Sequence, residues 1–178
     1  LLELQEQVEL ISVSPFDAPA ELTQVNPLSQ IPTLQLDSGE MLCGSSLIVE
    51  YLNAQTEQRS LMAKCQSHWQ MKNLAGIAEG IVDAALAVVL ETRRPEAQHS
   101  AKKIAGWQAK ILRSVAYLEQ QPLQDDKVDF YQLMLGVALG YLDFRQAELN
   151  WRDKAPKLCE WYAQARSQAW LEQTQPPA

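Results

Sequence analysis

The sequence predicts a two-part protein, in which a short α/β segment is followed by an entirely helical segment. Between Val8 and Tyr51, short β-rich runs alternate with turn residues. Beyond residue 60 the apolar residues recur with the 3.6-residue period of a helix. The polar stretch from Gln55 to Ser60 separates the two patterns and indicates a boundary. We therefore expect one domain at residues 1–56 and a second at residues 57–178.

Within the first segment, the pattern predicts a hairpin followed by a helix. Val8–Val13 and Thr33–Leu36 have the composition of strands. Asp37–Glu40 is a tight-turn sequence, because Gly39 can adopt the positive φ that a hairpin requires, and Met41–Cys43 is the expected return strand. Apolar residues at helical spacing then predict a helix over Ser45–Asn53.

The second segment predicts four clear helices. The first carries an apolar face from Leu74 to Val89 and ends before Pro95. The second runs from about Ile104 to Gln121. The third begins at Asp129, whose carboxylate is placed to form a variant capping box with Gln132. The last begins at Pro156, which suits the first turn of a helix.

Composition excludes several classes of protein. The chain has 178 residues, of which 47% are hydrophobic and 21% charged, which is typical of a globular protein rather than a disordered or fibrous one. Its net charge of -7, without a Lys/Arg-rich block, argues against a nucleic-acid partner. The longest uncharged apolar stretch, Phe130–Leu142, is shorter than the ~20 residues that cross a bilayer. We therefore expect no membrane span.

Cysteines and histidines are few. The three cysteines (Cys43, Cys65 and Cys159) form no Cys-x-x-Cys pair, so neither a disulfide framework nor a redox dithiol is indicated, and a reducing, cytoplasmic setting is expected. His68 and His99 are too far apart for a helical metal-binding pair. We expect no metal site.

The sharpest local feature is the proline-containing loop Asn26–Leu34. Pro32 has no amide hydrogen, so at the start of a strand it leaves the amide and carbonyl of Ile31 available to an extended, peptide-like ligand. The Ile31–Pro32 bond can also be cis at little cost. An ordinary strand-entry proline is the alternative interpretation.

A second feature is the turn Cys43–Ser46, which leads into the predicted helix. Unpaired amides and the helix dipole at this end favour an anion such as a carboxylate, and Ser45 offers an additional hydroxyl donor. The alternative is that Ser45 simply caps the helix.

These segments together resemble the glutathione-binding domain of glutathione S-transferases. The resemblance lies in the run Asn26–Leu34, with its Ile-Pro pair, and in the run Gly39–Leu52, with its hairpin, its Ser-headed helix and its Tyr-Leu end. In the helical segment, Leu139–Arg145, Trp151-Arg152 and Pro156–Leu158 resemble a bacterial branch of the same family. The resemblance covers essentially the whole chain.

The resemblance implies a thioredoxin-like α/β domain, incomplete at its N-terminus, followed by an all-α domain. It places Ile31 and Pro32 against the cysteinyl backbone of glutathione, and Ser45 against the γ-glutamyl carboxylate. Gly44 occupies the position at which the family usually has Glu, Asp or Gln to receive the glutamyl ammonium. A charge-assisted contact of that kind is worth about 1.5–3 kcal/mol.

By the same resemblance, Leu1–Gln7 is the end of the family's first helix. The first strand, and the Ser, Cys or Tyr that activates the glutathione thiol, would then lie upstream of Leu1. We therefore assign no catalytic residue within the sequence.

The activity implied is attack of the glutathione thiolate, with glutathione as substrate, on an apolar electrophilic small molecule by a cytoplasmic homodimer. Two alternatives stay open: a non-catalytic binding or regulatory module, which Gly44 favours, and a glutathione-dependent isomerase or thiol reductase. Asp83 is a candidate to replace the missing ammonium contact, although it also suits a solvent-facing position. Cys43 is a candidate for mixed-disulfide formation, although a buried structural role is the commoner one.

Overall fold

The computed structural model describes residues 1–56, 61, 68–123 and 128–175. The chain divides into two compact units, Leu1–Leu61 and Met62–Ala178. The boundary expected after residue 56 adjoins residues 57–60, which lie outside the described residues, as does Cys65. The exact domain limits therefore stay a prediction.

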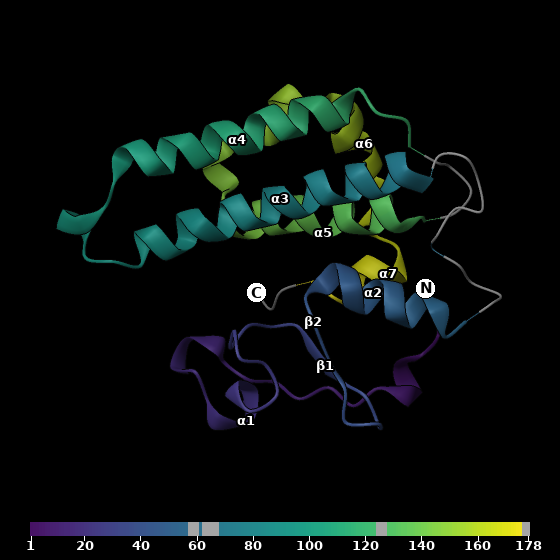
Figure 1. Ribbon diagram of the computed structural model, residues 1–178. Coiled ribbons are helices and arrows are strands. Elements are labelled where there is room, and N and C mark those ends of the chain that lie inside the picture. Colours follow the sequence, from purple (N-terminus) through teal and green to yellow (C-terminus); the bar gives the residue numbers. More distant parts are fainter. Residues whose placement is uncertain (57–60, 62–67, 124–127, 176–178) are drawn as a thin grey trace. The chain divides into compact units, whose positions relative to one another are not determined.

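The first unit combines one hairpin with short helical segments and a longer helix (Figure 1). Its elements are η1 (Gln5–Gln7), η2 (Pro15–Asp17), α1 (Ala20–Thr23), β1 (Thr33–Gln35), β2 (Met41–Cys43) and α2 (Ser45–Ala54). Helix α2 packs against both strands of the hairpin. The predicted order of hairpin and helix is thus confirmed.

The hairpin has the predicted turn and two strands close to the predicted ones. Strands β1 and β2 are antiparallel, with Thr33 opposite Cys43 and Gln35 opposite Met41. Gly39 has a φ of +87°, and its amide donates to the Leu36 carbonyl at 2.8 Å. Glycine adopts this conformation without a steric penalty, so the turn follows directly from the sequence.

Two predictions for the beginning of the chain are wrong. Val8–Val13 forms no strand, and Leu10 and Ile11 are 91% and 74% exposed. Successive side chains of an extended segment point to opposite sides, so this adjacent apolar pair provides no single face to bury. Leu1–Gln7 is not the end of an α-helix either, because its regular structure is the single 3₁₀ turn η1.

The second unit is helical throughout its described residues (Figure 1). Its elements are α3 (His68–Thr92), η3 (Glu96–Gln98), α4 (Ala101–Glu119), α5 (Phe130–Arg145), η4 (Ala147–Leu149), η5 (Trp151–Lys154), α6 (Pro156–Ala165) and α7 (Ala169–Glu172). The four predicted helices are α3, α4, α5 and α6. The short helix α7 was not predicted.

The core of this unit lies where α3 packs against both α4 and α5. Its fully buried side chains recur at helical spacing on each of the three helices: Ala78, Ile81 and Ala85; Ile111, Val115 and Leu118; Leu135, Leu139 and Leu142. Burial of such stripes is the main stabilising contribution to a helical domain. The predicted apolar faces are therefore the faces that the structure buries.

Helix α3 is long and apolar enough over Trp69–Thr92 to cross a membrane, by length and composition alone. Of the most apolar 18-residue stretch of this helix, 39% is buried inside the protein. The core helix of a helical domain meets the same test, and α3 contacts both α4 and α5. Its apolar character is thus partly explained by packing.

The N-terminus of α5 carries the predicted capping chemistry. The Asp129 carboxylate accepts a hydrogen bond from the Gln132 amide at 2.8 Å, and the Gln132 side chain accepts one from the Asp129 amide at 3.3 Å. This reciprocal arrangement is a capping box, and it satisfies two amides that the helix itself leaves unpaired.

A polar network holds the turn that follows α5. Asp143 accepts hydrogen bonds from the indole Nε1 of the buried Trp151 at 2.9 Å and from both terminal nitrogens of Arg152 at 2.6 Å. The Arg152 guanidinium lies over the Trp151 ring, 4.5 Å from its centroid. One carboxylate therefore fixes η5 to α5.

The N-terminus of α6 is capped by a residue from another helix. Glu119, at the end of α4, accepts from the amides of Lys157 and Leu158, both at 2.9 Å, while the residue preceding α6 makes no side-chain cap. A carboxylate at this position satisfies orphan amides and interacts favourably with the helix dipole.

We expect Glu119→Ala to lower the free energy of unfolding by about 1–2 kcal/mol, because two helix-terminal amides lose their acceptor. Urea unfolding followed by circular dichroism measures the change. Glu160→Ala removes an exposed carboxylate from α6 itself and serves as the matched control. Equal stability of the two variants would contradict the capping role.

Candidate functional site

The loop that enters β1 exposes the backbone of one residue. The Ile31–Pro32 peptide bond is cis, and Ile31 is 53% exposed. In the described part of the chain, neither the amide nor the carbonyl of Ile31 has a hydrogen-bond partner. The structure therefore leaves one donor and one acceptor of an extended backbone available at this edge.

The N-terminus of α2 lies directly beside this loop. The Gly44 amide donates to the Pro32 carbonyl at 3.3 Å, which continues the pairing of β1 with β2. Ser45, the first residue of α2, follows immediately. This hydrogen bond therefore brings together the two features predicted from the sequence, the loop at Ile31 and Pro32 and the turn that leads into α2.

The residue that caps α2 is Gly44, not Ser45. Gly44 has a φ of +95°, where glycine is favoured, and it makes no side-chain cap. Ser45 is already helical, so its interpretation as a plain N-cap is wrong. Apart from its two chain neighbours, no residue places an atom within 4 Å of the position that a Cβ of Gly44 would occupy. The N-cap residue of α2 therefore contributes no side chain to this end of the helix.

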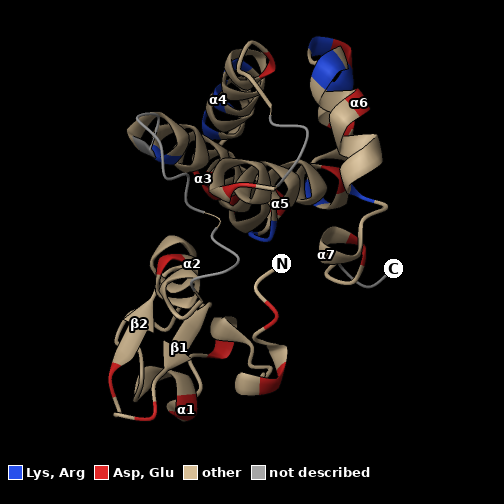
Figure 2. Cartoon of the chain, turned by 90° about the vertical axis from the view of Figure 1, so that its right-hand side faces the viewer, with Lys and Arg blue, Asp and Glu red and all other residues tan. Residues whose placement is uncertain are grey.

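The first unit has no basic side chain among residues 1–56, which limits the groups that can bind an anion there. Residues 1–56 contain eight Asp and Glu and no Lys or Arg, and Figure 2 shows the difference from the helical unit, which carries both signs. Within residues 1–56, an anion can therefore be held only by backbone amides, the dipole of α2 and uncharged polar side chains, not by a Lys or Arg side chain. The net charge of -7 for the whole chain does not reveal this difference.

Comparison with known proteins identifies the family. The model of the glutathione S-transferase N-terminal domain matches residues 1–55, and that of the glutathione S-transferase C-terminal domain matches residues 101–164. An uncharacterised GST-like protein of Escherichia coli, YibF, is 30% identical over 182 residues, covering 99% of this chain and 90% of that protein. The chain belongs to the glutathione S-transferase family.

Solved structures agree with this membership. A glutathione transferase family member from Pseudomonas fluorescens Pf-5, crystallised with bound glutathione, is 34% identical, with a TM-score of 0.92 over 99% of this chain and 92% of that chain. A glutathione S-transferase from Methylobacillus flagellatus, also with glutathione bound, is 28% identical, with a TM-score of 0.86 over 99% of this chain and 91% of that chain. The fold is therefore the thioredoxin-like plus helical architecture of glutathione S-transferases.

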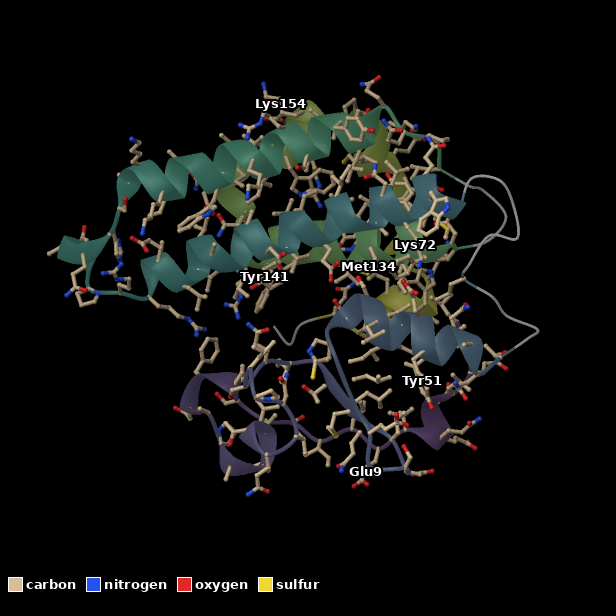
Figure 3. The ribbon with its side chains drawn as sticks, viewed as in Figure 1. Glu9, Tyr51, Lys72, Met134, Tyr141 and Lys154 are labelled. Atoms are coloured by element: carbon tan, nitrogen blue, oxygen red, sulfur yellow. The ribbon has the colours of Figure 1, made fainter. Side chains whose placement is uncertain are left out.

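In this glutathione S-transferase family member, the remaining sequence candidates are spread over both units. Cys43 is a free, half-buried thiol in β2, opposite Thr33. Tyr51, which belongs to the Tyr-Leu end of the resembling run and is not a candidate site residue, lies in the last turn of α2 (Figure 3). Asp83 is exposed on α3 in the helical unit. Its role toward an ammonium group stays a prediction. Among the described residues, no three His, Cys, Asp or Glu side chains are grouped as a metal site would require.

A hollow on the helical unit is lined mainly by polar and charged side chains, two of which pair with each other. It has a volume of about 330 Å³ and is lined by Asp143, Ala147, Asn150, Arg152 and Asp153. Asp143 and Arg152 already pair with each other. We assign no ligand to it.

Proposed function

We propose that this chain binds glutathione through the backbone of Ile31 and the N-terminus of α2. The cysteinyl part of the tripeptide pairs with the Ile31 amide and carbonyl beside Pro32, and the γ-glutamyl carboxylate meets Ser45. The observation that carries the proposal is the Gly44–Pro32 hydrogen bond, which places the exposed residue Ile31 beside the N-terminus of α2. Glutathione offers both an extended backbone and a carboxylate, so it matches both features.

The reaction proposed is transfer of the glutathione thiolate to an electrophilic, apolar small molecule. Holding the tripeptide along β1 orients its thiol, and orientation alone contributes substantially to the rate of a bimolecular reaction. Residues 1–56 would form the glutathione-binding domain and residues 57–178 the helical domain. A cytoplasmic homodimer completes the proposal, following the bacterial members that the sequence resembles.

A second candidate is a glutathione-binding module without catalysis. Gly44 favours it, because the site has no side chain at the position that receives the glutamyl ammonium elsewhere in the family. The two candidates differ in one assay. A transferase accelerates the conjugation of glutathione to a nitro-activated aryl halide, whereas a binding module binds glutathione and leaves the uncatalysed rate unchanged.

The full-length protein is expected to bind glutathione at millimolar concentration or below in a calorimetric titration. Two analogues of glutathione test the contacts of the γ-glutamyl carboxylate and amine separately. Removing the γ-glutamyl carboxylate (γ-aminobutyryl-cysteinylglycine) is expected to weaken binding by about tenfold or more, since a charge-assisted hydrogen bond is lost. Removing the amine instead (glutaryl-cysteinylglycine) is expected to change affinity little, because Gly44 offers the ammonium no partner.

Absence of glutathione binding at millimolar concentration would overturn the proposal. A large loss with the amine-free analogue alone would show that another carboxylate, such as that of Asp83, replaces the contact that Gly44 lacks.

A further inference from the structure

One buried side chain fastens both ends of the segment that displays Ile31. Asn26 is 1% exposed, and its Nδ2 donates to the Gln30 carbonyl at 2.9 Å and to the Thr33 hydroxyl at 3.0 Å. Its Oδ1 accepts from the Leu28 amide at 2.9 Å. Every hydrogen-bonding atom of the Asn26 carboxamide is therefore engaged within the loop.

Thr33 closes the network. Its hydroxyl accepts from Asn26 and donates to the Gln30 carbonyl at 2.8 Å. Gln30 immediately precedes Ile31, and Thr33 immediately follows Pro32. We call the hydrogen-bonded group of Asn26, Gln30 and Thr33 the Asn26 clasp.

The clasp determines where the unpaired groups of Ile31 lie. Within the described residues the Ile31 backbone has no hydrogen-bond partner of its own, and the Ile31 side chain is half exposed. Its position is therefore set by the chain on either side, where Asn26 holds Gln30 directly before Ile31 and Thr33 two residues after it. A buried polar side chain whose hydrogen bonds are all made favours one arrangement of the residues that it joins, and Asn26 is such a side chain.

We propose that Asn26 is a positioning residue for the ligand of this site, acting through Gln30 and Thr33 on the backbone of Ile31. The inference rests on the proposed binding of glutathione. It adds a residue that does not contact the ligand but fixes the donor and acceptor that do. Preorganised backbone groups bind a peptide more tightly because less ordering is required on binding.

Two substitutions of Thr33 distinguish a positioning role from a role in fold stability, because the two roles predict opposite orders of glutathione affinity for the two variants. Thr33→Val keeps the β-branched shape that favours a strand but removes the hydroxyl, whereas Thr33→Ser keeps the hydroxyl but has a lower strand preference. If the clasp positions Ile31, Val weakens glutathione binding by about three- to tenfold and Ser restores it. Thr23→Val removes a hydroxyl from α1, outside the clasp, and is expected to bind like the wild type.

Asn26→Asp changes the centre of the clasp without changing its size. The carboxylate places an acceptor where Nδ2 donates to the Gln30 carbonyl, so the loop can no longer close in the same way. The dissociation constant of glutathione, measured by calorimetry on protein shown to be folded by circular dichroism, is expected to rise by about tenfold or more. If Asn26→Asp does not fold, the glutathione affinities of Thr33→Val and Thr33→Ser alone test the positioning role.

The outcomes separate the two proposals. A wild-type protein that binds no glutathione overturns the proposed function. A wild-type protein that binds glutathione, with Thr33→Val binding as tightly and Thr33→Ser more weakly, overturns the positioning role while leaving the proposed function in place. Equal affinity for all Thr33 variants overturns the positioning role as well.

Discussion

Ser45→Asp is expected to abolish glutathione binding while leaving α2 as stable as before or slightly more stable. Ser45 is the first residue of α2. A carboxylate in the first turn of a helix stabilises it by about 0.3–1 kcal/mol, through the macrodipole. The same carboxylate occupies the anion site and repels the γ-glutamyl carboxylate of the ligand. Affinity is expected to fall at least about a hundredfold, through lost contacts and repulsion.

The opposite signs of the two effects make the prediction specific. Calorimetry measures the affinity, and urea unfolding measures the stability. Ser38→Asp is the matched control, because it adds the same charge to the same unit in the turn at the other end of the hairpin. Ser45→Ala is expected to give an intermediate loss. If Ser45→Asp and Ser38→Asp bind glutathione equally well, the anion is not held at the N-terminus of α2.

Asp143→Ala is expected to produce the largest loss of stability among the predictions made for the helical unit. The substitution leaves the indole nitrogen of Trp151, a residue only 1% exposed, without an acceptor and leaves Arg152 unpaired. Leaving a buried donor unsatisfied costs about 1–3 kcal/mol, so we expect the free energy of unfolding to fall by about 2–3 kcal/mol. Asp153→Ala is the control, because it removes an exposed carboxylate from the same short helix, η5. It is expected to change the free energy of unfolding by less than about 0.5 kcal/mol.

The Asp143 network also predicts a dependence on pH. Burial raises the pKa of the Asp143 carboxyl, but the hydrogen bonds from Arg152 and Trp151 outweigh this effect, and the pKa is lowered overall. A lowered pKa means that the carboxylate stabilises the fold above the unfolded pKa of about 4 and that this contribution is lost as the pH falls through the folded pKa. The stability difference between wild type and Asp143→Asn is therefore expected to shrink on acidification. A difference that is constant from neutral to acidic pH would contradict the assignment.

Local signals in the sequence predicted most of the elements correctly. The hairpin follows from Gly39, and the start of α5 from the Asp129–Gln132 pair, because each depends on residues close together in the chain. The expected strand at Val8–Val13 failed because a strand also needs a hydrogen-bonded neighbour, which a local pattern does not reveal.

The candidate site was predicted in part. Ile31 and the helix start near Ser45 could be found from Pro32 and from the turn before α2. The assignment of the cap to Gly44 required the observed backbone conformation. The Asn26 clasp was missed because its two partners become neighbours only when the loop folds back. An Asn before a Pro at the start of a loop, which favours a side-chain turn, is the available sequence signal.

The most direct test of the account is a glutathione titration of the full-length, ¹⁵N-labelled protein followed by amide NMR. Binding through the Ile31 backbone and the N-terminus of α2 predicts that the amides of Ile31, Ser45 and Ser46 shift together, with one common dissociation constant, and that the Ile31 amide becomes protected from exchange. Shifts confined to the helical unit, or an unchanged spectrum at millimolar glutathione, would contradict it.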